Sequence, residues 1–253
     1  MTAEMKTLFD FLEVPLNDSA TVLDRFSGLP GAVSSGEGQQ RSVYVPGSRE
    51  DRVALVAHAD TVWAGDPVRS SITDLVTDGH TVRSTDPSKG IGADDRAGCA
   101  ILWLLKDSGH SLLVTDGEEH GQTGANWLMA NRPGIASEIN GSHRFMVEFD
   151  RRDSHDLKRY FVGTNAFLAY VENSMPGFRR AVNAFGQEDR GSFTDICTLC
   201  TGICGINLSV GYRNAHSPAE TLVLKDWLNT LETARSWLCD SGELPLHPLA
   251  VDD

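Results

Sequence analysis

Histidine and carboxylate residues follow several apolar segments of this 253-residue chain, at points where buried strands would end. The segment "VALVAHAD" ends in His58 and Asp60, and "LLVTDGEE" ends in the adjacent pair Glu118 and Glu119. Three further candidates are Asp150 at the end of "RFMVEFD", Asp94 in the glycine-rich "GIGADDRAG" and His216 in "NAHSPAE". Mixed His and Asp/Glu ligands suit zinc or a similar divalent ion. This set of residues therefore predicts a metal site.

Each of these residues has a simpler explanation when it is taken alone. A histidine after a strand is more often hydrogen-bonded within the structure than bound to a metal, and Asp94 or Asp150 could cap a helix or a turn. Adjacent glutamates usually form a solvated surface. The joint arrangement favours a site, because ligands of parallel α/β sheets bind outside the carboxyl ends of the strands.

The segments that carry these residues predict strands alternating with helices. Continuous apolar runs predict buried strands within 51–60, 111–119, 144–150 and 205–212, and "HTVRST" predicts an edge strand. Helical periodicity is present in 94–109, in 123–130 and in 218–238, the last as one long amphipathic helix. This alternation predicts an α/β fold with a largely parallel sheet covered on both faces.

The length of the chain and its 40% hydrophobic content allow one full core, so we expect a single catalytic domain spanning 1–253. Its first forty residues predict two short helices, 5–14 and 19–28, and then a Gly/Ser/Gln-rich turn region, 28–40. We interpret residues 1–40 as a helical N-terminal cap on this domain.

The composition of the chain argues against some classes of binding partner. The net charge of −13 and the pI of about 5.0 argue against a nucleic-acid partner. We find neither a targeting segment nor an apolar run of membrane-spanning length, and we therefore expect no membrane partner and a cytoplasmic location. The five cysteines do not have the spacing of a secreted disulfide framework.

The cysteine cluster "CTLCTGIC" offers an alternative metal site. Cys197 and Cys200 are spaced as in zinc or iron–sulfur sites. However, a second such pair is missing and the neighbouring residues are apolar or small. We therefore interpret Cys197, Cys200 and Cys204 as buried structural thiols.

The order of the motifs resembles the co-catalytic zinc aminopeptidase and carboxypeptidase superfamily. The resemblance covers about residues 52 to 240, and "EFDRRDSHD" and "FTDICTLCTGICGINLSVGY" are similar to its aminopeptidase-type members. It implies a three-layer α/β/α sandwich with a mostly parallel mixed central sheet. It also implies two zinc ions per chain at the strand ends, with cobalt or manganese as alternative metals.

The resemblance further implies a role for each candidate residue. Five would be metal ligands, namely His58 and Asp150 on one ion, Glu119 and His216 on the other, and Asp94 on both. Asp60 would orient the imidazole of His58. Glu118 would be the general base.

Many members of the superfamily carry an inserted lid or dimerisation domain. Here 36 positions separate His58 from Asp94, and 66 separate Asp150 from His216, so we expect no inserted lid domain. Oxyanion donors and substrate contacts would then come from local residues. The candidates are Tyr212, Arg213 and Asn214, with Ser192 to Asp195 and Trp63 as further ones.

These features predict a zinc-dependent exopeptidase, an aminopeptidase or dipeptidase, that acts on short peptides. One alternative is a zinc-dependent amidohydrolase that deacylates N-acyl amino acids, and another is a one-zinc glutaminyl-cyclase-like enzyme. A non-enzymatic zinc-binding protein is disfavoured, because a pure binder needs no base such as Glu118. The oligomeric state stays open.

Overall fold

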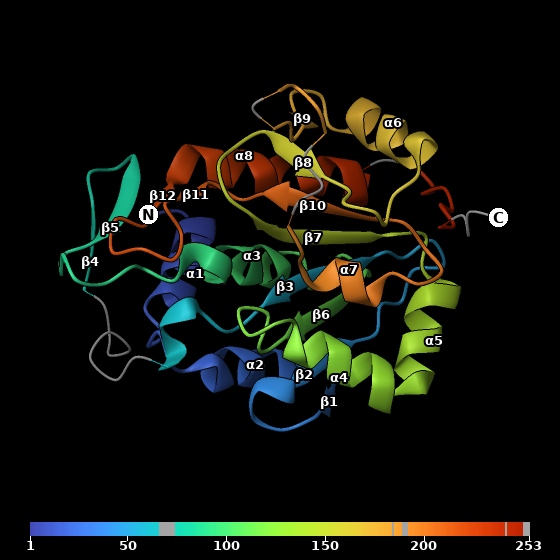
Figure 1. Ribbon diagram of the computed structural model, residues 1–253, viewed down its shortest axis with the longest axis horizontal. Helices are drawn as coiled ribbons and strands as arrows, with labels where there is room; N and C mark the ends of the chain where they lie inside the picture. Colours follow the sequence, from blue (N-terminus) through green and yellow to red (C-terminus); the bar gives the residue numbers. More distant parts are fainter. Residues whose placement is uncertain (66–73, 184, 189–191, 241, 250–253) are drawn as a thin grey trace.

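An eight-stranded mixed sheet forms the centre of the protein, which we describe from a computed structural model (Figure 1). The structure describes residues 1–65, 74–183, 185–188, 192–240 and 242–249. The strands follow the order β1-β2-β6-β3-β7-β10-β8-β9. Their bounds are β1 Val33–Ser35, β2 Ser42–Val45, β3 Ala54–His58, β6 Ser111–Thr115, β7 Met146–Arg151, β8 Asp156–Lys158, β9 Arg179–Arg180 and β10 Gly205–Ser209.

The four central strands, β6, β3, β7 and β10, run parallel to one another. Every residue of β3, β6 and β10 is buried, as their continuous apolar runs predict. Ala54 pairs with Ser111 on one side and with Met146 on the other, so the three strands share a register. Their carboxyl ends therefore lie at the same edge of the sheet. The outer strands β1, β2 and β8 pair antiparallel with their inner neighbours.

Helices cover both faces of this sheet (Figure 1). One face carries α1 Ala3–Leu12, α2 Ser19–Ser27, α3 Ala93–Leu104, α6 Asn165–Ser174 and α8 Leu224–Arg235, and the other carries α4 Thr123–Asn131, α5 Pro133–Ser142 and α7 Asp195–Leu199. Successive residues of β3 enter the two cores alternately, with Leu55 in one and Val56 in the other. The predicted three-layer α/β/α sandwich is confirmed. None of the described helices combines the length and the apolarity that crossing a bilayer requires.

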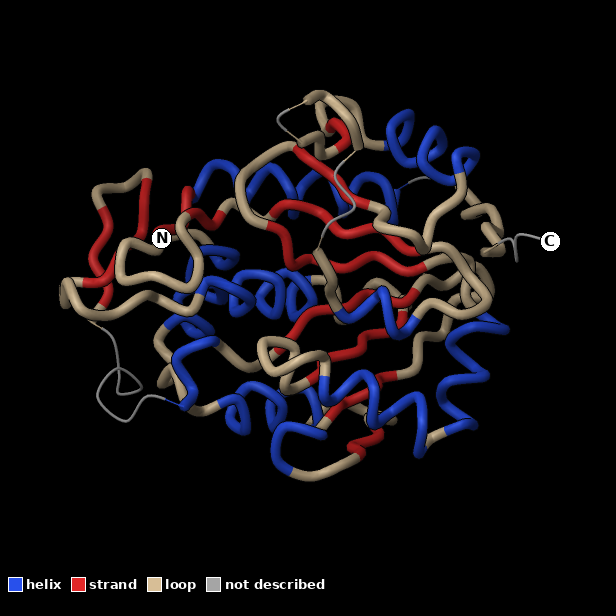
Figure 2. Tube along the Cα trace, in the orientation of Figure 1, coloured by secondary structure: helices blue, strands red, loops and turns tan. Residues whose placement is uncertain are grey.

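A smaller, four-stranded antiparallel sheet lies beside one end of the main sheet (Figure 2). Its order is β11-β12-β5-β4, with bounds β4 Leu75–Thr77, β5 Thr81–Ser84, β11 Tyr212–Arg213 and β12 Thr221–Val223. The segment "HTVRST" was predicted to be an edge strand, and this position is wrong because β5 lies between β4 and β12. The prediction of one helix over 218–238 is also wrong. That stretch forms β12, then α8, then a π-helical turn at Ser236–Asp240, because the β-branched Thr221 and Val223 pair with β5.

The N-terminal segment contains both predicted helices. Helix α1 packs on α3, and α2 packs on β2 and β6. The prediction of a continuous turn region over 28–40 is wrong at 33–35, because β1 pairs with β2 and extends the main sheet. A short 3₁₀ helix, η1 Gly38–Gln40, follows β1, and a second one, η2 Val62–Gly65, follows β3. The interpretation of residues 1–40 as a cap on a single catalytic domain stays a prediction.

A buried polar cluster occupies the amino-terminal end of β6, opposite the strand ends that carry the candidate site. His143 is 1% exposed, and its Nε2 lies 2.7 Å from Ser111 Oγ. The same hydroxyl accepts a hydrogen bond from the Gly47 N–H. Burial lowers the pKa of His143 to about 4. The imidazole is therefore neutral at pH 7 and serves as a partner for the hydroxyl of Ser111.

We predict that His143 makes the fold sensitive to mild acid. The unfolded state, in which the histidine pKa is near 6.5, binds the proton more tightly than the folded state does. The stabilisation that the neutral ring provides is therefore complete above pH 6.5 and is lost as the pH falls toward 4. Denaturant unfolding of the wild type and of His143→Gln at intervals across this range should show a flatter dependence in the variant. The exposed His80 provides the control, since His80→Gln should keep the wild-type slope.

Candidate metal centre

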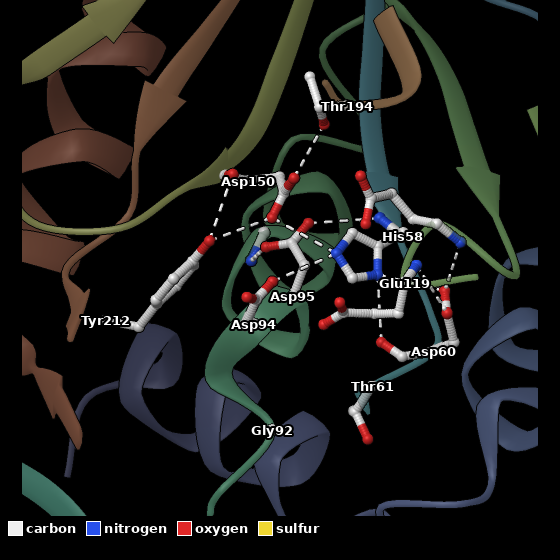
Figure 3. A network of polar contacts seen from close by, with 12 residues as sticks. His58, Asp60, Thr61, Gly92, Asp94, Asp95, Glu119, Asp150, Thr194 and Tyr212 are labelled. Carbon is white, nitrogen blue, oxygen red and sulfur yellow. Dashed lines mark hydrogen bonds and ion pairs between the residues drawn. The ribbon is translucent and has the colours of Figure 1, made fainter. Parts of the chain in front are cut away.

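His58, the last residue of β3, is 1% exposed and lies among three carboxylates (Figure 3). Its Nε2 is 3.3 Å from Asp94 Oδ1 and 3.4 Å from Asp150 Oδ1. Its Nδ1 is 3.2 Å from Asp60 Oδ1 and 3.1 Å from the Asp60 carbonyl oxygen. One ring nitrogen thus faces Asp94 and Asp150 while Asp60 holds the other, which is how a carboxylate orients a metal-binding imidazole.

Asp60 also fixes the loop that carries the two adjacent glutamates. Its Oδ1 accepts a hydrogen bond from the Glu118 N–H at 3.1 Å, and its Oδ2 accepts one from the Glu119 N–H at 3.2 Å. The Glu119 carboxylate approaches His216, with Oε1 2.9 Å from Nε2. Glu118 instead lines a cavity above the strand ends. The two neighbouring side chains therefore have different surroundings, as the sequence predicts.

Asp94 lies at the start of α3, in a turn that Gly92 permits. Gly92 has a φ of +62°, the left-handed conformation that glycine adopts without a steric penalty. Asp94 and Asp95 have non-helical backbone angles, and the peptide bond between them is cis. Oδ1 of Asp94 faces His58, and Oδ2 is 3.0 Å from His216 Nε2. One carboxylate therefore contacts both histidines.

Glu220 holds this turn in place from the loop that also carries His216. Its Oε2 accepts hydrogen bonds from the N–H groups of Ile91 and Gly92, each at 2.8 Å, and its Oε1 accepts one from the Asp94 N–H at 3.1 Å. Burial raises the pKa of this carboxyl to about 7. The sequence analysis did not single out Glu220, although an acidic residue four positions after a candidate ligand was a visible signal.

Hydrogen bonds orient the carboxylate of Asp150, at the end of β7. Thr194 Oγ1 donates to Oδ2 at 2.9 Å, and the Tyr212 hydroxyl donates to Oδ1 at 3.2 Å (Figure 3). The Asp150 N–H donates to Asn207 Oδ1 at 3.0 Å. Tyr212 was predicted as a substrate contact. In the structure its hydroxyl is instead hydrogen-bonded to Asp150, a candidate metal ligand.

A cavity of ≈ 560 Å³ opens over these groups. The candidates that line it are Asp94, Glu118, Asp150, Ser192, Phe193, Thr194, Tyr212, Arg213, Asn214 and His216. Arg213 is ion-paired with Asp226, with Nη2 3.3 Å from Oδ2, and Asn214 donates to the Ala219 carbonyl at 3.3 Å. Asp195 is fully buried and accepts a hydrogen bond from the Thr115 hydroxyl. Trp63 is buried against Gly90 and is not among the described lining residues.

Two overlapping groups of side chains are arranged as metal-ligand sets. His58, Asp94 and Asp150 offer ligand atoms within 4.8 Å of one another, and so do Asp94, Glu119 and His216. Asp94 belongs to both groups. Glu119 Oε1 is buried and forms no hydrogen bond of proper geometry with the described residues, although His216 is close. The donor chemistry and this unsatisfied oxygen both fit a divalent cation.

The electrostatics of the site reflect its concentration of carboxylates. The neighbouring carboxylates of Asp94 and Glu119 raise the pKa of His216 to about 11. Burial lowers the pKa of His58, but the charge of Asp150 and hydrogen bonds to the three carboxylates outweigh it and raise this pKa well above its usual range. Burial raises the pKa of Glu118 to about 9. Positive charge in this volume is therefore strongly favoured.

The cysteines lie outside these groups. All five are free thiols, and no metal-ligand group within the described ranges includes one. Burial raises the pKa of Cys197 to about 12 and that of Cys200 well above its usual range. Cys200 and Cys204 are buried, which agrees with the interpretation as structural thiols, whereas Cys197 is partly exposed.

The overall structure is similar to solved peptidase structures. Its TM-score is 0.67 with a tripeptidase from Staphylococcus aureus, 0.64 with aminopeptidase PepT from Bacillus cereus and 0.64 with an aminopeptidase from the archaeon Desulfurococcus kamchatkensis. The matches cover 94%, 93% and 96% of this chain and 97% of each of those chains, at 14% sequence identity. No known family's sequence pattern matches the chain, and no curated protein matches it in sequence. At this identity the likeness establishes a shared fold.

We predict that Glu220→Gln loosens the turn that holds Asp94. An amide cannot accept all three hydrogen bonds, so at least one buried N–H would lose its acceptor. The affinity for divalent ions should fall by roughly 10–100-fold, the usual cost of removing a partner that orients a metal ligand. Titration of the metal-free protein with zinc measures this, and the exposed Glu50→Gln is the matched control. Equal zinc affinities in Glu220→Gln and Glu50→Gln would refute the role of Glu220.

Proposed function

We propose that the protein is a zinc-dependent exopeptidase, an aminopeptidase or dipeptidase that hydrolyses short peptides. The observation that carries this proposal is the shared position of Asp94. Its carboxylate belongs to both metal-ligand groups, and the same cavity contains the carboxyl group of Glu118. The tripeptidase and aminopeptidases that share the fold support this choice of reaction.

In the proposed site each residue keeps the role that its surroundings favour. His58 and Asp150 would hold one ion, Glu119 and His216 the other, and Asp94 both. Bound divalent ions supply Lewis-acid polarisation of the peptide carbonyl and activation of a water molecule. Cobalt or manganese would supply the same chemistry.

Glu118 acts as the general base in this proposal. It accepts a proton from the attacking water, because the positive charge of bound divalent ions would favour its ionised form, and it returns that proton to the leaving amine. Asp60 keeps Glu118 in place through the backbone N–H and at the same time orients His58. Thr194 and Tyr212 orient the Asp150 carboxylate. Arg213 and Asn214 contact the substrate at the rim of the cavity.

Five free thiols favour a reducing compartment, which supports a cytoplasmic location.

The substrate that we propose is a short peptide with an accessible end, bound by a single catalytic domain without an inserted lid domain. N-acyl amino acids are the alternative substrates. A panel of peptides with a free amino group and their N-acylated counterparts distinguishes the two. Cleavage of only the acylated set would replace the peptidase by a deacylase.

The first prediction from this proposal concerns the number of ions. The wild type should bind two zinc ions per chain, as measured by elemental analysis after dialysis. His216→Ala removes a ligand of one group only and should retain one ion, whereas Asp94→Ala removes the shared ligand and should weaken both. A protein that holds no more than one ion at saturating zinc would contradict the dinuclear site.

The second prediction separates the adjacent glutamates. Glu118→Gln should keep both metal ions, because Glu118 is not in either ligand group. Turnover should nevertheless fall by about 10²–10⁴-fold, the usual contribution of a positioned acid–base group. Glu119→Ala should instead weaken metal binding, because it removes a ligand. Peptide hydrolysis and metal content are measured on the same samples.

The exposed Glu13 provides the control for both changes, since Glu13→Gln should leave turnover and metal content as in the wild type. Near-normal turnover in Glu118→Gln would show that Glu118 is not the base. Loss of metal in Glu118→Gln but not in Glu119→Ala would show that the two roles are exchanged.

A further inference from the structure

Two exposed aromatic rings contact each other, and one of them lines the cavity of the candidate metal centre. Phe193 is 69% exposed and lines the cavity, and Phe161 is 57% exposed. Their ring centroids are 6.0 Å apart with an interplanar angle of 63°, an edge-to-face arrangement. The two rings, which we call the aromatic pair, therefore contact each other while both remain open to solvent.

The backbone around Phe193 is fixed on both sides by polar contacts. Ser192 Oγ accepts a hydrogen bond of 2.7 Å from Nζ of Lys158, a residue that is 2% exposed. Thr194 Oγ1 donates to Asp150 Oδ2 at 2.9 Å. The ring of Phe193 is thus presented by a segment that is bonded directly to a candidate metal ligand.

Phe161 is held by a similar scaffold. The preceding residue, Tyr160, is 3% exposed, and its hydroxyl accepts a hydrogen bond from Asn207 Nδ2 at 3.2 Å. Lys158 Nζ lies 4.7 Å from the centroid of the Tyr160 ring. The same buried lysine therefore contacts the residue that precedes each member of the aromatic pair.

The aromatic pair differs from the other surroundings of the cavity. Among the described lining residues, Phe193 has the only large apolar side chain that is more than half exposed; Tyr160 and Tyr212 are almost completely buried. Most other lining side chains are charged or polar. Single exposed apolar residues are common, but a fixed and paired ring beside a reactive centre offers apolar area that a ligand can cover.

We propose that the aromatic pair forms a subsite for a bulky apolar side chain of the peptide, next to the bond that is cleaved. This inference rests on the proposed peptidase function. Covering Phe193 with a leucine or phenylalanine side chain removes apolar area from water on both partners, whereas an alanine side chain is too short to do so. The protein would therefore select peptides by the size and apolarity of one residue.

The test is a comparison of kcat/KM across two series of tripeptides, X-Ala-Ala and Ala-X-Ala, where X is Ala, Leu, Phe or Asp. In one of the two series the wild type should prefer Leu and Phe over Ala by on the order of tenfold, the typical effect of filling or emptying a hydrophobic pocket. Phe193→Ala should reduce this Leu-to-Ala ratio to near one, and Phe161→Ala should reduce it partly. Phe193→Leu should restore most of it, because an apolar surface remains.

Phe185 provides the matched control. It is 88% exposed, and it is not among the described residues that line the cavity. Phe185→Ala should keep the wild-type preference, and the zinc content of every variant is measured alongside. An equal fall of kcat/KM for all peptides in Phe193→Ala would indicate a structural role and overturn the inference.

The outcomes also separate this inference from the proposed function. A wild type that cleaves the alanine peptides but has no apolar preference in either series would overturn the aromatic subsite and leave the peptidase standing. A wild type with two bound zinc ions that cleaves none of the peptides would overturn both.

Discussion

Negative charge buried at the strand ends is the constraint on which the rest of the structure depends. Carboxylates repel one another in a volume that excludes water, and each must be protonated, paired or bound to a cation. Burial raises the pKa of Asp150 to about 6 and that of Asp195 to about 7. His58 and His216 lie between the carboxylates and supply positive charge to them. A pair of divalent cations would satisfy the same requirement with more charge per unit of volume.

The fold meets this constraint with a shared register and a few shared partners. Because β6, β3 and β7 run parallel and begin together, the residues after each strand arrive at one place. Asp60 then bonds both to the ring of His58 and to the loop after β6, so one side chain sets the relative position of two strand ends. Glu220 does the same for the turn of Asp94 and the loop of His216. The positions of the candidate metal ligands therefore depend on the carboxylates of Asp60 and Glu220.

Much of the fold could be predicted from the sequence, because the buried parallel strands have continuous apolar runs. The strands within 51–60, 111–119, 144–150 and 205–212 and the helix after Asp94 are all present. The errors occur where distant pairing decides the structure. Thr221 to Val223 was assigned to a helix and pairs with β5, and Val33 to Ser35 was assigned to a turn and pairs with β2. Neither partner could be inferred from local periodicity.

For the site, the residue types and their order placed the seven candidates at one edge, and the structure brings them together there. Thr194 and Tyr212 were predicted as substrate contacts and Glu220 was not singled out, because their bonds to Asp150 and to the turn of Asp94 are tertiary contacts. The aromatic pair was equally hidden, because exposure is a property of the folded chain. Phe193 was a candidate substrate contact only as a member of the segment 192–195, and Phe161 was not singled out. The sequence also could not distinguish an aminopeptidase from a deacylase, because the two enzymes differ in the substrate that they bind and not in their metal ligands.

The smaller sheet is connected to the candidate metal centre through the loop between β11 and β12. His216 and Glu220 lie in the connection between β11 and β12, whereas Asp94 begins a helix that packs on the main sheet. Any ion held by Asp94 and His216 together would raise the free energy needed to open the smaller sheet locally. Backbone amides of β5 and β12 would then exchange their hydrogens more slowly in the loaded protein. Strand β5 contributes no residue to the described lining of the cavity, yet it would report whether that cavity is filled.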